Sequence, residues 1–294
     1  FKQRYDELVV LTDSPAVKLW TVLLLVALVV APAFLSPFMM AHMTTILFVA
    51  IGALGITVLT GFAGQISGGY AYAIGITRLG LPPELALLAS ALVPAVFGLI
   101  VGLPSLRLHG LYLAITTLAF SHIVGAALLA GGAFTGGGRG IIVGRPVLFG
   151  MDLGSDRAFY WFCLAMCVLA VLVTLNLRRS YAGRAMVAIR DNDIAARTMG
   201  INLVRFKLMA FLISAAITGI AGALMAMYIS IVSVESFPFL LSIEALAIII
   251  VGGLGSVLGA ILGTIFIVTL PELFSALMSF VGGRYADTMA SSAH

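Results

Sequence analysis

Charged residues are scarce in this sequence. Only 10% of its 294 residues are Asp, Glu, Lys or Arg, whereas 62% are hydrophobic and the mean hydropathy is +1.17. Soluble globular domains carry about 25% charged and about 45–50% apolar residues. A chain this apolar cannot bury its side chains in one water-soluble core, whereas lipid accepts them on the outside of a helix bundle. The composition excludes a soluble domain and predicts an integral membrane protein.

Cysteine and lysine are also rare. The two cysteines, Cys163 and Cys167, lie one helical turn apart in an apolar stretch, so we expect buried thiols and no disulfide framework or metal cluster. The three lysines are Lys2, Lys18 and Lys207, and none follows a glycine. A P-loop places its lysine directly after a glycine, against the phosphates. The chain therefore carries no conventional ATPase site of its own.

Long apolar runs fill most of the chain. A helix needs about 20 apolar residues to cross a bilayer. We expect an all-α polytopic membrane protein with about eight transmembrane helices, some of them broken by glycine and lining a pathway. The expected spans are 19–35, 38–60, 61–76, 84–103, 111–130, 158–177, 208–232 and 243–270.

Basic residues predict the orientation of these spans. Residues 178–207 carry seven Lys or Arg, and loops rich in these residues face the cytoplasm. Alternation from this loop places residues 131–157 on the outer side and the N-terminus in the cytoplasm, provided that 61–76 crosses the membrane. The expected divisions are a cytoplasmic segment 1–17, a transmembrane domain 18–284, and a tail 285–294 that reads in part as a cloning remnant.

The basic loop is longer than a connection between two spans requires. Residues 181–199 predict one helix with basic side chains on one side and alanines between them, and Gly200 is expected to end it in the left-handed conformation. Asp191 and Asp193 lie near its middle. A solvated helix, or one on anionic headgroups, is the alternative. The acidic pair and the small residues favour docking into a groove of another protein.

Two glycine-rich segments, 61–69 and 252–256, are candidates for a solute pathway. Broken helices expose backbone N–H and C=O groups within the membrane, where these groups can replace the water around a polar solute. The alternative is that glycines and alanines at four-residue spacing serve close helix packing, as at Gly98, Gly219 and Gly259. Glu244 could meet a substrate ammonium group or an arginine. The pathway candidates are Gly61, Gly64, Gln65, Ser67, Thr117, His122, Glu244, Gly252, Gly255 and Ser256.

Four segments of the chain are distinctive: residues 60–67, 103–120, 183–202 and 242–256. Taken in this order, they resemble the permease subunits of bacterial branched-chain amino acid ABC transporters. The resemblance covers most of 44–270. The chain is shorter than the family pattern between Gly75 and Leu81 and after Tyr285.

The resemblance implies an ATP-driven import permease of the bacterial inner membrane, which is not itself an enzyme. Its partners would be a second homologous permease, two cytoplasmic ATPases that bind ATP-Mg, and a periplasmic solute-binding protein that contacts 131–157. This chain would bind lipid, no cofactor and no nucleic acid. The residues that would contact the ATPase are Arg184, Arg190, Asp191, Asp193, Ala195, Ala196, Arg197 and Gly200.

Three alternatives stay open on the sequence. Relatives with the same motifs move urea and small amides, and nothing in the residues separates these substrates from branched-chain amino acids. A secondary transporter or channel would not need the basic loop and normally carries more intramembrane ionisable residues. An intramembrane serine hydrolase would use Ser67 and His122, but the residues around Ser67 lack the spacing of a nucleophile turn and no supporting acid is evident.

Overall fold

The computed structural model describes residues 26, 28–58, 63–106, 111–148, 150–237, 239–253 and 255–292. Helices dominate these residues, and the protein is an all-α polytopic membrane protein, as the composition predicts. The two cysteines, Cys163 and Cys167, are free and buried, as expected.

Five helices of the described residues are long and apolar enough to cross a bilayer. They are α3 (Pro37–Val58), α5 (Pro83–Ser105), α8 (Asp156–Arg179), α11 (Leu203–Ile229) and the first part of α13 (Val257–Ser292). α6 (Leu111–Ala130) adds a sixth if its continuation through α7 (Gly132–Thr135) and η1 (Gly137–Arg139), bent by 112°, is counted with it. The expected count of eight is not confirmed, and residues 19–25 and 27 of the expected span at 19–35 lie outside the described residues, whereas 28–34 are helical.

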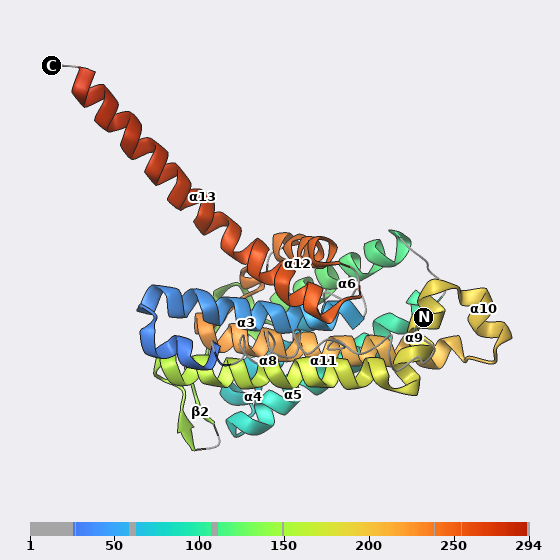
Figure 1. The fold of residues 1–294 in the computed structure, drawn as a ribbon. Helices are drawn as coiled ribbons and strands as arrows, with labels where there is room; N and C mark the ends of the chain where they lie inside the picture. The colour runs from blue at the N-terminus through green and yellow to red at the C-terminus, as the bar shows by residue number, and fades with distance from the viewer. Residues whose placement is uncertain are drawn as a thin grey trace.

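The centre of the bundle is α11. It packs against α3, α4 (Ala63–Thr77) and α5, and α8 packs along α3 (Figure 1). Side chains of α3 and α11, such as Leu54 and Leu224, are fully buried. By contrast Leu88, Leu92 and Val96 are exposed along one face of α5. Apolar side chains repeated every four residues on an outer face are what a lipid contact requires, which accounts for the low charge of the sequence.

Small residues bring the helices together, as their spacing predicts. A Cβ added to Gly98 of α5 would lie only 2.8 Å from the Cβ of Ala215 on α11. At Gly219 of α11 an added Cβ would collide with the backbone carbonyl of Ser90 on α5. Helices in lipid associate through such close backbone packing, because the hydrophobic effect does not drive them together.

α4 differs from its expectation as a glycine-broken segment. From Ala63 it is one regular helix, and its glycines serve packing: Gly68 lies against the backbone of Gly219, and Gly222 of α11 lies against the carbonyl of Gln65. Residues 59–62 lie outside the described residues. The break expected over 61–69 is therefore wrong for the described part of this range, because these glycines make room for α11.

The expected single span at 243–270 is wrong. The chain forms α12 (Phe239–Gly252), turns at 253–256, and returns as α13. Gly253 and Gly255 have φ of +99° and +81°, a left-handed conformation that glycine adopts without a steric cost. Backbones of the two helices touch, since Gly259 lies against the carbonyl of Gly252. We call α12, the turn and the start of α13 the hairpin.

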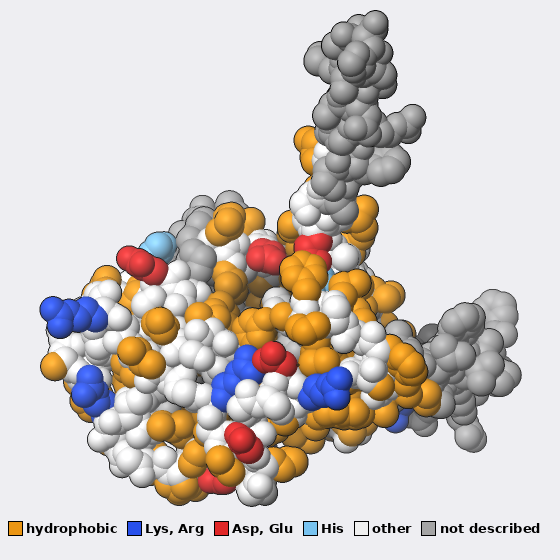
Figure 2. Space-filling model, turned by 90° about the vertical axis from the view of Figure 1, so that its left-hand side faces the viewer, with side chains coloured by type: hydrophobic (Ala, Val, Ile, Leu, Met, Phe, Trp, Pro, Cys, Tyr) orange, Lys and Arg blue, Asp and Glu red, His pale blue; other side chains and the backbone are white. Residues whose placement is uncertain are grey.

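The two ends of the bundle carry different structures (Figure 1). At one end, β1 (Ile141–Ile142) pairs antiparallel with β4 (Ile231–Val232), and β2 (Val147–Leu148) pairs with β3 (Met151–Asp152). We call this the strand end; Figure 2 looks onto it and shows basic and acidic side chains among apolar ones. At the other, the loop end, lie α9 (Tyr181–Asp191) and α10 (Asp193–Thr198). The short helix η2 (Val234–Ser236) lies between β4 and α12.

Candidate functional site

The basic loop contains two helices, where the sequence predicts one. Asn192 separates them: its backbone is extended, and its Oδ1 accepts hydrogen bonds from the N–H groups of Ile194 and Ala195, both at 3.0 Å. Asparagine is a preferred N-cap because its side chain satisfies these free donors, so α9 ends and α10 begins here. Gly200 follows α10 with φ +81°, the left-handed stop that the sequence predicts.

α9 is fixed to the membrane helices on both sides. Ala185 and Ile189 of α9 pack with Ala196 of α10 and Phe206 of α11 in one buried cluster. Ser180 caps α9, its Oγ accepting from Gly183 N at 3.2 Å, directly after the end of α8. The loop is therefore a packed extension of α8 and α11, on which a partner's force can act.

The predicted ATPase-contact residues divide by exposure. Arg184, Arg190, Asp191, Ala195, Arg197 and Gly200 are exposed, whereas Ala196 is buried and Asp193 is half-buried. The carboxylate of Asp193 pairs with Lys207 Nζ of α11 at 2.8 Å, so it fastens α10 to the bundle. Sequence reasoning missed Ile194 and Met199, which are 78% and 86% exposed. Their signal is two large apolar side chains in a segment, 193–199, that otherwise holds Asp, Ala, Arg and Thr.

Arg190 reaches from the end of α9 to the turn of the hairpin. A Cβ added to Gly255 would collide with Arg190 Nη1, and the Cζ and Nη2 atoms would lie 3.4 and 3.7 Å from it. The guanidinium thus lies over Gly255. A predicted ATPase-contact residue and a predicted pathway residue are brought together here, at the loop end of the molecule.

The other pathway candidates lie on different helices. Ser67 is buried and Gln65 half-buried on α4, whereas His122 is exposed on α6. Glu244 of α12 is half-buried, and among the described residues no hydrogen bond or ion pair reaches it. Its neighbour Ala245 packs against Ile56 of α3.

Three further candidates are only partly described. Gly61 lies outside the described residues, and at Gly64 and Thr117 the description extends to the helix backbone alone. Gly252 and Ser256 frame the turn of the hairpin; Ser256 Oγ accepts from Gly259 N at 3.0 Å and so caps α13. These two residues shape the turn, and the structure does not place them in the middle of the bundle.

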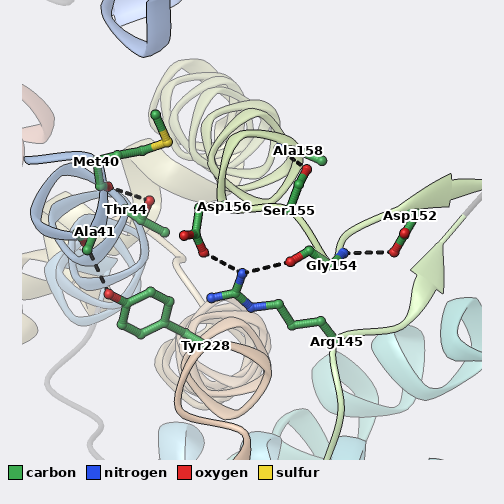
Figure 3. A network of polar contacts seen from close by, with 10 residues as sticks. All are labelled: Met40, Ala41, Thr44, Arg145, Asp152, Gly154, Ser155, Asp156, Ala158 and Tyr228. Atoms are coloured by element: carbon green, nitrogen blue, oxygen red, sulfur yellow. Dashed lines mark hydrogen bonds and ion pairs between the residues drawn. The ribbon is translucent and has the colours of Figure 1, made fainter. Parts of the chain in front are cut away.

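Arg145 organises the strand end (Figure 3). Its Nη1 lies 2.6 Å from Asp156 Oδ1 and donates to the carbonyl of Gly154 at 3.3 Å. Its Cζ lies 5.1 Å from the ring centre of Phe159 on α8 and 5.9 Å from that of Tyr228 on α11. Tyr228 in turn donates its hydroxyl to a backbone carbonyl of α3 at 3.5 Å. This arginine joins the segment before β2 to α8 and α11, which the sequence alone does not indicate.

Comparison with known proteins finds one family model and several permease proteins that are similar to this sequence. The sequence model of the family described as branched-chain amino acid transport system / permease component matches residues 38–291. The high-affinity branched-chain amino acid transport system permease protein LivM of Escherichia coli is 37% identical over 290 residues, which cover 85% of this chain and 68% of LivM. LivM of Salmonella typhimurium is 36% identical over 289 residues, covering 85% and 67%.

A second kind of permease is more distantly similar. The permease protein LivH of Salmonella typhimurium, named for the same high-affinity branched-chain amino acid transport system, is 29% identical over 138 residues, which cover 47% of this chain and 44% of LivH. No significant match was found among solved structures.

Proposed function

The chain belongs to the family of branched-chain amino acid transport permeases, and from this premise we propose that it carries branched-chain amino acids across the membrane as one permease subunit of an ATP-driven importer. The observation that carries the proposal is α10, which is packed onto a transmembrane helix yet presents exposed apolar side chains. A secondary transporter or channel has no need for such a surface.

The proposed ATPase contact is the face of α10 and its C-terminal turn. Ile194 and Met199 stand out from it, and Arg197 is exposed beside them. Exposed aliphatic side chains of this size favour burial in a partner, and a basic neighbour adds attraction to an acidic groove rim. In this proposal the partner ATPase holds ATP-Mg, and its closure pulls on α10.

The remaining partners follow from the two ends of the molecule. The relatives include two kinds of permease, LivM and LivH, which supports a second permease beside this chain. We place the loop end in the cytoplasm, the N-terminus with it, and the strand end in the periplasm of a bacterial inner membrane. Exposed Ile142, Val147 and Met151 at the strand end suit contact with a solute-binding protein.

The pathway is proposed to run beside the hairpin. A half-buried carboxylate without a partner among the described residues, Glu244, suits the ammonium group of an amino acid. Tyr70 and Tyr72 of α4 add buried hydroxyls that have no hydrogen-bond partner in the described part of the chain. The substrate class comes from the family, and urea or small amides are the competing cargo.

The test is purification from native membranes in mild detergent, followed by reconstitution. We expect two ATPase chains and a second permease to co-purify, and the complex in vesicles to take up radiolabelled leucine with ATP and the binding protein. If the vesicles take up labelled urea and not leucine, the proposed substrate class is wrong and urea or small amides take its place. Recovery of this chain alone across several detergents would overturn the importer and favour a secondary transporter.

A further inference from the structure

The turn of the hairpin lies directly beneath the side chain of Arg190. The guanidinium occupies the space that a side chain at Gly255 would need, with its Cζ 3.4 Å from that Cβ position. Gly255 also has φ +81°, so any other residue here would be strained as well as crowded. Glycine at this position therefore leaves room for the guanidinium and adopts the left-handed backbone conformation without strain.

Arg190 lies where α9 meets both α10 and the buried cluster of the loop. Ile189, the residue before it, is buried in the cluster that joins α9, α10 and α11. Asn192, two residues later, caps α10. Arg190 thus stands between the helix that presents the proposed ATPase surface and the packing that fixes the loop to the bundle. Gly255, over which the guanidinium of Arg190 lies, is three residues beyond the C-terminus of α12, where a cation interacts favourably with the helix dipole.

The hairpin can respond to this contact as one body. Its two helices touch backbone to backbone, with Gly259 against the carbonyl of Gly252 and Gly263 against that of Ile248. Close backbone contact leaves little freedom for one helix to slide independently of the other. A displacement at the turn therefore reaches Glu244, which lies on α12, and the contact of α12 with Ile56 of α3.

We propose that Arg190 is a positioning residue that passes the movement of the ATPase-contact loop to the hairpin, so that ATP binding moves α12. This inference rests on the proposed function and deepens it. The role belongs to the side chain of Arg190 itself, and docking is left to α10 and its C-terminal turn.

The test compares coupling with assembly in the reconstituted complex. Arg190→Ala is expected to keep the ATPases bound and hydrolysing ATP, while leucine uptake per ATP hydrolysed falls by at least about fivefold, the lower range of coupling between sites. Arg205→Ala, at an exposed arginine at the start of α11, is the matched control and is expected to retain the wild-type ratio. An unchanged ratio in Arg190→Ala would overturn the inference.

A second variant approaches the contact from the other side. Gly255→Ala changes no residue of the loop but puts a methyl group where the guanidinium of Arg190 lies, so uptake per ATP is expected to fall there too. If the contact carries the effect, the double variant is no worse than the more impaired single variant. Additive losses would overturn the inference, and so would normal coupling in Gly255→Ala.

Movement of the hairpin is read directly by spin labels. With the native cysteines replaced, labels at exposed Val251 of α12 and Met209 of α11 are expected to change separation on ATP binding in the wild type but not in Arg190→Ala. An equal change in both would overturn the inference. A wild-type complex that assembles without ATP-dependent uptake would instead overturn the proposed function, so the two failures are distinguishable.

Discussion

Lys207 and Asp193 form an ion pair, with Nζ 2.8 Å from Oδ2, that fastens α10 to the first turns of α11. The pair is partly shielded from water, with 20% and 27% of the two side chains exposed. Because α10 is only six residues long, this contact and the buried Ala196 contribute much to its orientation. The ion pair therefore helps to set the direction in which the proposed ATPase surface faces.

The ion pair yields the first prediction. Lys207→Asp places two carboxylates together, and we expect ATPase co-purification to fall about tenfold, since like charges at this distance cost about 1 kcal/mol or more. The double variant Lys207→Asp with Asp193→Lys exchanges the two charges, so the ion pair can form again, and most of the binding is expected to recover. Full binding in the single variant, measured by titration of the ATPase, would show that α10 keeps its orientation without the pair.

The exposed apolar side chains of α10 give the second prediction. Ile194→Ser combined with Met199→Ser is expected to weaken ATPase binding by at least about tenfold, because a central apolar contact typically contributes 1 to 2 kcal/mol or more. Ile142→Ser is the matched control, since Ile142 is 76% exposed at the opposite end. Co-purification from detergent measures both. Equal loss in the control would point to general instability and contradict the docking surface.

The Arg145 network gives the third prediction. Arg145→Ala removes an ion pair and two ring contacts, worth about 0.5–1 kcal/mol each at an exposed site. We expect protease added from the strand end to cut residues 131–157 several-fold faster, while ATPase binding is unchanged. Arg157→Ala, at an exposed arginine of the same loop and helix start, is expected to behave as wild type. Equal cleavage rates in the two variants would mean that the network does not hold the loop.

Helix packing at Gly219 gives the fourth prediction. Gly219→Ala places a methyl group against the Ser90 carbonyl, and overpacking of this kind costs about 1–3 kcal/mol. A lower midpoint of thermal unfolding in detergent is expected. Gly144→Ala is the control, because an added Cβ there meets nothing within 4 Å. The packing argument fails if both variants unfold at the same temperature.

Glu244 gives the fifth prediction. Glu244→Gln keeps the size of the side chain and removes its charge, so the complex should assemble while leucine uptake falls by about tenfold, the cost of losing a charged hydrogen bond. Glu235→Gln, at an exposed acid of η2, serves as the control. Normal uptake in Glu244→Gln would remove this residue from the pathway.

The membrane class and most spans were predictable from the sequence because apolar length alone decides them. The spans expected at 38–60, 84–103, 158–177 and 208–232 correspond to α3, α5, α8 and α11 within a few residues. Gly200 was also predictable, since a glycine after a helix favours the left-handed stop. These features depend on local sequence, so no knowledge of the fold is needed to find them.

The hairpin and the contacts of the loop were not predictable in the same way. Hydropathy cannot separate one span from two helices joined by a turn, because both sides of the turn at 253–256 are apolar. The contact of Arg190 with Gly255, and that of Lys207 with Asp193, depend on where the fold brings distant residues. Asn192 had a local signal, its capping preference, but the helical periodicity on both sides of it concealed the break.

The shortness of α12 has a consequence for the membrane. Its 14 residues rise about 21 Å, less than the roughly 30 Å of a hydrocarbon core, whereas the 27 residues of α11 rise about 40 Å. The chain between Ser230 and Phe237 therefore descends without a long helix, and Phe237 reaches Gly69 in the middle of α4. Lipid offers no partner for the backbone groups of such a segment. The protein supplies those partners itself, because β4 pairs with β1 and the turns of η2 bond within the segment, so α12 reaches into the bundle without spanning a bilayer on its own.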